Sequence, residues 1–158
     1  MWLYDGKERR CSHYDIKEKD TLIVDTEFMG KGLIANECID KGEYIVPYEG
    51  EILFHRPQHN SEYVVEIRLA VDDKRRSQKC YIDAKNSSSK GRYVNHACEN
   101  NAVIYKVMKA GCDIPKLWIK AIKNIVVGEE ILVNYGPDME LMLSNMGGCL
   151  CMRCRNGN

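Results

Sequence analysis

The 158-residue sequence lacks an excess of charge of either sign, because 23 Lys and Arg residues balance 23 Asp and Glu residues. No overall field therefore draws the molecule onto DNA, RNA or an anionic membrane. With only 12 Gly and 4 Pro beside 44% hydrophobic residues, the composition excludes collagenous, low-complexity and disordered chains. The length fits the prior of about 100 to 200 residues per domain, so we expect one soluble globular domain.

Long apolar runs are also absent. No stretch approaches the roughly 18 apolar residues of a membrane span. Met1 to Arg10 is charged and lacks the apolar centre of a secretory signal. We therefore expect no membrane partner and a reducing compartment. Internal repeats, linkers and alternation of strand and helix are missing too, so Gly30-Lys31-Gly32 is not a dinucleotide-binding fingerprint.

Short apolar and β-branched runs, bounded by Gly, Pro, Asn or charge, recur along the chain. They predict strands at Thr21–Val24, Leu33–Ala35, Tyr44–Tyr48, Glu51–Phe54, Tyr63–Val71, Cys80–Asp83, Ala102–Val107, Leu117–Ile122 and Ile131–Tyr135. Helical spacing occurs only in Asp138–Met146 and Ser87–Tyr93. This pattern predicts a mainly β or α+β fold.

Three connections carry signals of their own. Lys41–Glu43 and Val127–Glu129 each centre on a glycine and precede a predicted strand, so both are predicted turns. Asp72–Lys79 is dense in charge and is predicted to be an exposed loop.

The eight cysteines fall into two groups. Those scattered singly are interpreted as small buried hydrophobes: Cys11, Cys38, Cys80 and Cys112. Cys149, Cys151 and Cys154 instead crowd into the last ten residues, and Cys98 lies in a polar cluster. Three thiolates on one turn, completed by Cys98, match the four tetrahedral ligands of Zn²⁺. A disulfide within Cys-x-Cys is geometrically awkward and opposed by a reducing compartment, so we predict one structural zinc.

Two further segments are unusually rich in chemistry. Arg92–Asn101 combines donors, acceptors and a potential ligand with almost no aliphatic residues, and Gly128–Gly136 is a turn and strand that ends in a tyrosine beside glycine. With the cysteine cluster and the motifs Gly30-Lys31-Gly32-Leu33, Tyr48-Glu49-Gly50-Glu51 and Tyr81-Ile82-Asp83, in this order, the sequence resembles the SET-domain protein lysine methyltransferases. The resemblance spans roughly Thr21 to Cys154.

The resemblance implies a SET-domain fold of several small curved sheets, with a knot-like C-terminal crossing and a zinc-bound post-SET tail. It implies an N-terminal extension at 1–20, a SET domain at 21–136 and the tail at 137–158. S-adenosylmethionine is the implied methyl donor, and a lysine of a histone tail or another protein is the implied acceptor. Nuclear, chromosomal residence follows from the same analogy.

Site residues are carried over position by position. The resemblance assigns cofactor binding to Gly30, Lys31, Gly32, Tyr63, Asn95 and His96, and catalysis to Tyr135 and Tyr48. The glycine turn suits close approach of a cofactor because glycine has no Cβ. Alternatives stay open for two positions: His96 as a buried histidine satisfied by a backbone carbonyl, and Tyr63 as an ordinary core residue of a strand.

Several positions depart from the family pattern. Val133 stands where the family usually carries Phe or Tyr and lines the substrate channel, so we expect a roomier pocket that admits di- or trimethylation. Ala97, Asn100 and Asn134 are milder replacements. The spacing between the last two cysteines is shorter than usual.

Two groups of like charge have bland and functional interpretations. One group is a set of lysines that either form a solvated face or make weak non-specific contacts with nucleosomal DNA: Lys106, Lys109, Lys116, Lys120 and Lys123. Glu49, Glu51, Glu62 and Glu66 are solvated surface, or steer a basic peptide.

Rival functions are a non-histone lysine methyltransferase and a catalytically silent SET-like module that binds a peptide or chromatin. A zinc-ribbon nucleic-acid binder is disfavoured by only three clustered cysteines and the neutral charge balance.

Overall fold

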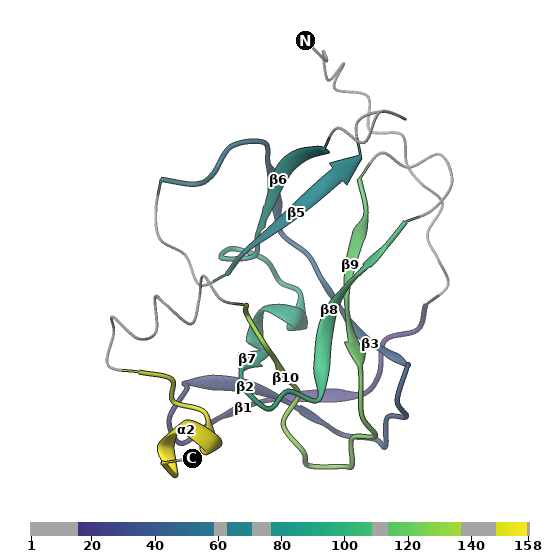
Figure 1. The fold of residues 1–158 in the computed structure, drawn as a ribbon. Helices are drawn as coiled ribbons and strands as arrows, with labels where there is room; N and C mark the ends of the chain where they lie inside the picture. The colour runs from purple at the N-terminus through teal and green to yellow at the C-terminus, as the bar shows by residue number, and fades with distance from the viewer. Residues whose placement is uncertain (1–15, 59–62, 71–76, 109–113, 137–147, 158) are drawn as a thin grey trace.

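The computed structural model describes residues 16–58, 63–70, 77–108, 114–136 and 148–157, and the chain is mostly strand there (Figure 1). The strands are β1 Thr21–Asp25, β2 Lys31–Ala35, β3 Tyr44–Tyr48, β4 Glu51–Leu53, β5 Val64–Ala70, β6 Ser77–Asp83, β7 Asn95–His96, β8 Ala102–Val107, β9 Lys116–Ala121 and β10 Leu132–Val133. A 3₁₀ turn, η1 (Lys90–Tyr93), and a one-turn helix, α2 (Met152–Arg155), complete the described elements. Neither has the length or hydropathy to cross a membrane.

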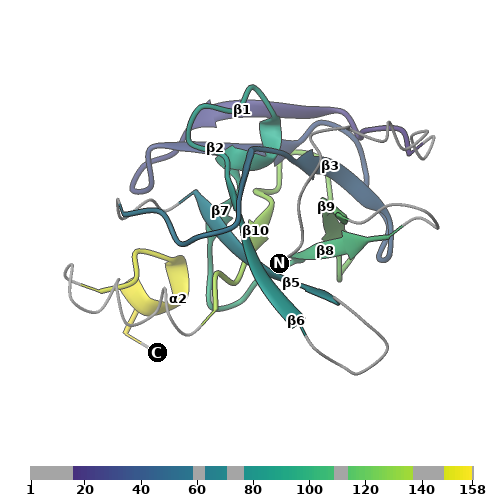
Figure 2. The same cartoon turned by 90° about the horizontal axis from the view of Figure 1, so that it is seen from above.

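The strands form three separate sheets, in agreement with the several small sheets that the family resemblance implies. β1 pairs with β2, the central sheet has the order β3-β9-β8-β10-β7, and the third has the order β4-β6-β5. The first and third sheets lie on opposite sides of the molecule, with the central sheet between them (Figure 2).

Every predicted strand has a counterpart, but several bounds differ. Ser77, Gln78 and Lys79 belong to β6, so the prediction that the charged loop extends to Lys79 is wrong. The reason is register: β5 pairs with β6 along its whole length, and backbone hydrogen bonds hold these exposed polar residues in the ladder. Asp72–Arg76 lies outside the described residues, as does the predicted helix Asp138–Met146.

Two short elements depart further from expectation. The predicted helix Ser87–Tyr93 is only the 3₁₀ turn η1, whose first free N–H, that of Gly91, is capped by the Ser89 hydroxyl. Strand β7 was not predicted, because two residues carry no periodicity and the strand exists only through parallel pairing with β10.

The final strand lies between two earlier segments. β10 pairs in parallel with β7 on one side and with β8 on the other. Amides of the connecting loop follow it, because Ala97 N donates to Val133 O at 3.0 Å and Asn101 N donates to Leu132 O at 3.2 Å. The Asn-His segment and the strand leading to Tyr135 are thereby fixed side by side.

A single apolar cluster lies beneath these crossings. Its largest fully buried members come from β2, β3, β9, β10 and the adjoining turns: Leu33, Ile39, Ile45, Leu117, Ile119, Ile125, Ile131, Val46 and Val133. The predicted turns are present, with Gly42 and Gly128 at φ of +96° and +84°, values that favour glycine. Burying this cluster supplies the main driving force for the fold.

The cysteines that are scattered singly along the sequence differ in their burial. Cys80 is fully buried, as predicted, whereas Cys38 is exposed, which contradicts its interpretation as a buried hydrophobe. Cys38 lies in the loop between β2 and β3, where the side chain meets solvent because the neighbouring Ile39 takes the inward position. Cys11 and Cys112 lie outside the described residues.

Candidate active site and metal centre

Two tyrosines are held by carbonyl groups at the centre of the candidate site. Tyr48, the last residue of β3, donates its hydroxyl proton to Tyr63 O at 2.7 Å, and Tyr135 donates to Val94 O at 2.6 Å. A phenol that donates to a carbonyl keeps oxygen lone pairs that accept hydrogen bonds. Both oxygens can therefore accept from an incoming amine.

Tyr48 is a neutral phenol at physiological pH. Its side chain is buried, and this burial raises its pKa well above the ordinary value of 10.0, with Tyr135 and Asp83 acting in the same direction. Tyr48 therefore serves as a hydrogen-bonding wall, because a phenolate would have to form in a poorly solvated position.

His96 ties the Asn-His segment to Tyr135. The imidazole is buried, and its Nδ1 accepts a hydrogen bond from Tyr135 N at 3.1 Å. The other ring nitrogen, Nε2, lies 3.8 Å from Cys98 Sγ. The ring centroids of His96 and Tyr135 are 5.4 Å apart. His96 consequently fixes the position of the Tyr135 backbone just after the end of β10.

The predicted cofactor turn and Asn95 come together across β2 and β7. Gly30 turns the chain with φ of +69°, and Lys31 follows at the start of β2. Asn95 Nδ2 donates to Lys31 O at 3.1 Å and to Glu130 Oε1 at 2.9 Å. An ideal Cβ on Gly32 would lie 2.5 Å from Glu130 Oε1, so the space beside this glycine is filled by a carboxylate.

Arg92, which was not among the predicted site residues, supplies a positive charge beside Tyr63. Its guanidinium carbon lies 4.8 Å from the Tyr63 ring centroid, and Nη1 donates to Ser87 O at 3.1 Å. Its Nε is buried and has no hydrogen-bond partner within the described part of the chain. Membership in the Arg92–Asn101 segment was the available sequence signal, and this unused donor fits a carboxylate ligand.

Val133, the predicted channel residue, is a buried residue of β10. It is 1% exposed and belongs to the core cluster on β10. Its Cα partners are His96 on β7 and Ala102 on β8. Its side-chain volume therefore affects the packing beneath the site as well as any channel above it.

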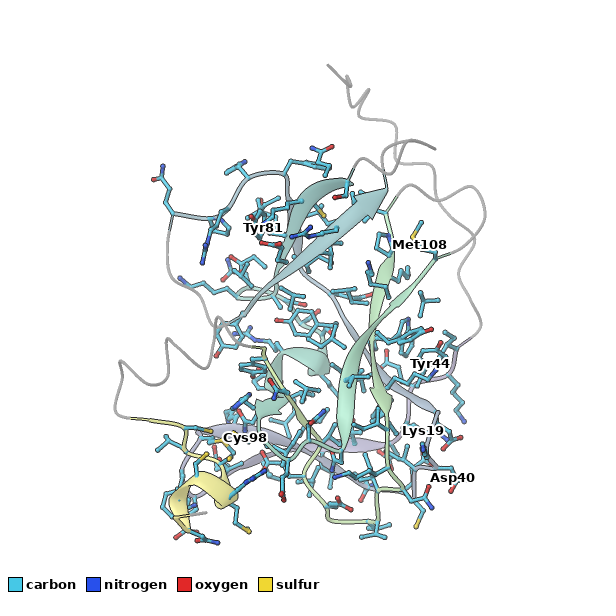
Figure 3. The ribbon with its side chains drawn as sticks, in the orientation of Figure 1. Lys19, Asp40, Tyr44, Tyr81, Cys98 and Met108 are labelled. Carbon is cyan, nitrogen blue, oxygen red and sulfur yellow. The ribbon has the colours of Figure 1, made fainter. Side chains whose placement is uncertain are left out.

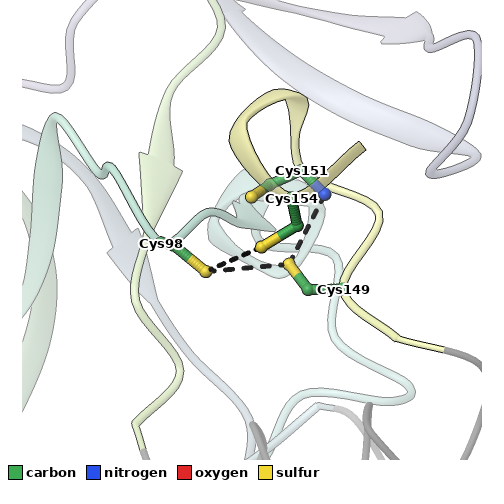
Figure 4. Close-up of side chains that lie close together, drawn as sticks. All are labelled: Cys98, Cys149, Cys151 and Cys154. Carbon is green, nitrogen blue, oxygen red and sulfur yellow. Dashed lines mark hydrogen bonds between the residues drawn. The ribbon is translucent and has the colours of Figure 1, made fainter. Parts of the chain in front are cut away.

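The four predicted metal ligands converge at the C-terminal end of the molecule, where Cys98 lies beside α2 (Figure 3). All four sulfur atoms lie within 4.8 Å of one another. Cys98 Sγ is 3.9 Å from Cys149 Sγ and 3.5 Å from Cys154 Sγ (Figure 4). Four thiolates about 2.3 Å from a tetrahedral zinc are separated by about 3.8 Å, so the cluster has the right size for this metal.

The crowding of the four cysteines shifts the pKa values of their thiols in opposite directions. Burial alone raises the pKa of Cys151, but backbone amides of Cys98 and Cys154 and thiol donors of Cys149 and Cys154 lower it to about 6. The hydrogen bond to Cys154 and then burial raise the pKa of Cys98, and burial raises that of Cys149. Crowded thiols therefore keep protons that a metal would displace.

Two arginines on α2 attach the tail elsewhere. Arg153 Nη1 lies 3.4 Å from Glu99 Oε1, and the Arg155 guanidinium lies 3.0 Å from the Phe28 ring centroid. Phe28 belongs to the loop that leads to Gly30. The tail thus contacts both the loop after β7 and the loop before β2.

In the structure, some members of the predicted lysine and glutamate groups have partners within the protein. Glu66 is paired with Lys79 at 3.0 Å, while Lys120 lies over the rings of Tyr44 and Tyr105, with Nζ 5.0 and 4.4 Å from their centroids. Glu62 and Lys109 lie outside the described residues.

Comparison with known proteins identifies the family. The model of the SET domain matches residues 30–136. The chain belongs to the SET-domain family. The match covers the Gly30–Gly32 turn, the Asn-His segment and β10 with the following Tyr135, which are the parts of this SET domain that meet in the structure.

Curated relatives carry names of the same kind. The SET domain is 31% identical over 122 residues to the histone-lysine N-methyltransferase SETMAR of Mus musculus, covering 72% of this chain and 39% of that protein. It is 30% identical over 163 residues to a variant-silencing SET domain-containing protein of Plasmodium falciparum, covering 92% of this chain and 6% of that protein. The chain thus spans less than half the length of these relatives.

A solved structure supports the fold. The methyltransferase domain of human histone-lysine N-methyltransferase SETMAR superposes with a TM-score of 0.59 at 28% identity, covering 75% of this chain and 45% of that one. The sequence-based fold assignment is therefore confirmed.

Proposed function

We propose that this SET domain is an S-adenosylmethionine-dependent protein-lysine N-methyltransferase that acts on a histone-tail lysine. The observation that carries the proposal is the pair of carbonyl-anchored phenols, Tyr48 and Tyr135, with Tyr135 fixed directly by His96. The histone substrate is supported by the names of the relatives, which include two enzymes described as specific for lysine 36 of histone H3.

S-adenosylmethionine, when bound, supplies an electrophilic methyl group on a sulfonium. The residues that would hold it are the Gly30–Gly32 turn, Asn95, His96 and the wall formed by Tyr63. The unpartnered Nε of Arg92 fits the cofactor carboxylate, and this fit does not depend on the assignment of the other residues.

The substrate lysine must arrive as a neutral amine, because its ordinary pKa of about 10.4 leaves it protonated in water. Burial between aromatic side chains lowers this pKa by disfavouring the charged form. The hydroxyl oxygens of Tyr48 and Tyr135 then accept N–H groups and point the nitrogen lone pair in one direction. Most of the rate gain comes from this orientation of two reactants.

The cysteine cluster would hold one structural zinc through Cys98, Cys149, Cys151 and Cys154. Zinc would fix the C-terminal tail to the loop after β7, because Cys98 is the only one of these ligands outside the tail. We further propose an N-terminal extension at 1–20, a catalytic domain at 21–136 and a zinc tail at 137–158, in a protein that resides in the nucleus.

The direct test is transfer of radiolabelled methyl from S-adenosylmethionine to core histones, nucleosomes and a whole-cell extract, beside the Tyr135→Phe variant. Label on a histone that disappears with the variant supports the proposal. Label confined to extract proteins identifies a non-histone methyltransferase. Cofactor binding without transfer to any substrate overturns the catalytic proposal and leaves a binding module.

A further inference from the structure

The side-chain amide of Asn95 is oriented by two acceptors. Nδ2 donates to Lys31 O at 3.1 Å and to Glu130 Oε1 at 2.9 Å. A backbone carbonyl has no proton to donate and an ionised carboxylate has none either, so the amide nitrogen must face both of them. The Oδ1 atom points the other way and accepts no hydrogen bond from the described residues.

Glu130 reaches Asn95 through a space that only glycine leaves open. An ideal Cβ on Gly32 would lie 2.5 Å from Glu130 Oε1, 2.6 Å from Thr26 Cγ2 and 3.1 Å from Asn95 Nδ2. The backbone around Glu130 is also fixed, since its Cα pairs with Ile34 in an isolated bridge. The missing side chain of Gly32 therefore makes room for the carboxylate of Glu130. This is a second role for the glycine, in addition to the close approach of a cofactor that the sequence suggests.

The neighbouring glutamate has a different task. Glu129 Oε1 accepts from Asn101 Nδ2 at 2.9 Å, and its Oε2 accepts from Val126 N at 3.1 Å. Glu129 makes no hydrogen bond to Asn95 in the described structure, although it adjoins Glu130 in the chain. The two carboxylates are therefore a natural test and control pair.

We propose that Glu130 is a positioning residue that holds Asn95 Oδ1 as the acceptor for the α-ammonium group of S-adenosylmethionine. The inference rests on the proposed function, which places the cofactor at Asn95. A carboxylate that takes the Nδ2 proton leaves the amide oxygen facing the ligand, and amide oxygen suits an ammonium while amide nitrogen would repel it. Loss of Glu130 leaves Lys31 O as the one acceptor that still orients the amide within the described residues, so the amide is held less firmly.

The experiment is isothermal titration of the purified chain with S-adenosylmethionine and with 5′-methylthioadenosine, which has the same nucleoside but no amino-acid end. Glu130→Ala is expected to weaken S-adenosylmethionine binding about tenfold, the loss typical of one charge-assisted hydrogen bond, and to leave methylthioadenosine binding unchanged. Glu130→Gln is expected to restore affinity, because its Oε1 still accepts from Asn95. In Glu129→Ala the ratio of the two affinities stays at the wild-type value.

Equal weakening of both ligands by Glu130→Ala would show a structural role and overturn the inference alone. A wild-type chain that binds neither ligand would instead overturn the proposed function. If circular dichroism shows that Glu130→Ala is unfolded, Glu130→Met, which keeps the side-chain length without the carboxylate, replaces it with the same expected selectivity. A wild-type ratio of affinities in the folded Met variant would also overturn the inference.

Discussion

Tyr135 is fixed at both ends of the residue, by its amide to His96 and by its hydroxyl to Val94. Removing only the hydroxyl in Tyr135→Phe keeps the ring and its packing. We expect kcat to fall by about 100-fold or more, because the amine loses an oriented partner, while the dissociation constant of S-adenosylmethionine is nearly unchanged. Tyr105→Phe, on the exposed face of β8, is the matched control. A parallel loss of cofactor affinity in Tyr135→Phe would indicate a structural role.

The size of the side chain at position 133 is expected to affect how many methyl groups are transferred to the lysine. A side chain smaller than Phe or Tyr at this position leaves more room, so prolonged reaction is expected to yield di- or trimethyllysine. Mass spectrometry of the product reads this directly. Monomethyl product alone, at saturating cofactor, would contradict the prediction and assign Val133 a purely packing role in the core.

The raised pKa of Tyr48 predicts that the free energy of unfolding decreases at alkaline pH. Its folded-state pKa is raised by burial, so the native state keeps a proton that the unfolded state loses near pH 10.0. The stability contribution of Tyr48 is thus complete below that pH and declines above it, by up to about 1.4 kcal/mol per pH unit. Urea unfolding of wild type and Tyr48→Phe at about pH 8 and about pH 11 measures it. An equal alkaline loss in both proteins would show that other groups are responsible.

At the scale of elements, Gly50, which lies between β3 and β4, packs closely against the backbone at the end of β6. A Cβ here would overlap the backbone carbonyl of Asp83, which no side-chain rotation can relieve. Gly50→Ala is therefore expected to lower the free energy of unfolding by about 1 to 3 kcal/mol. Glu49→Ala, at the exposed neighbouring position, is the control and should change it much less. A stable Gly50→Ala protein would mean that β4 moves away from β6 at little cost.

The elements also differ in how far local sequence specifies them. The predicted strands Tyr44–Tyr48 and Ala102–Val107 match the observed bounds, because their apolar residues alternate or cluster within the segment itself. Strand β7 has only Asn95 and His96 and is created by its partner β10. The polar start of β6 is likewise held by β5, so local composition there predicted a loop.

At the scale of the whole molecule, metal content tests how the tail is attached. We expect about one zinc per chain in the purified protein, and its loss in Cys98→Ser, since three thiolates leave a tetrahedral site incomplete. Mass spectrometry of metals checks this, with Cys38→Ser, an exposed cysteine outside the cluster, as the control. Chelation or Cys151→Ser should also weaken methyl transfer. Full activity of metal-free protein would contradict a supporting role for zinc.

The sequence by itself determined the family and the mostly β architecture, because both follow from motifs that occur in a fixed order along the chain. Tyr48, Asn95, His96, Tyr135 and the cysteines are all recognisable from the chain alone. Their convergence is a separate matter. Cys98 lies 51 residues from Cys149, and only the path of the chain brings their sulfur atoms to 3.9 Å.

The tertiary structure decided which groups orient the predicted ones. Glu130 is one of two adjacent glutamates in a turn, and nothing in the sequence distinguishes it from Glu129. The β1–β2 hairpin and the insertion of β10 beside β7 aim one carboxylate at Asn95 and the other at Asn101. The structure likewise places the Arg92 guanidinium carbon 4.8 Å from the ring centroid of Tyr63, 29 residues earlier in the chain. Hydrogen-bond partners distant in the chain depend on geometry, which local composition does not encode.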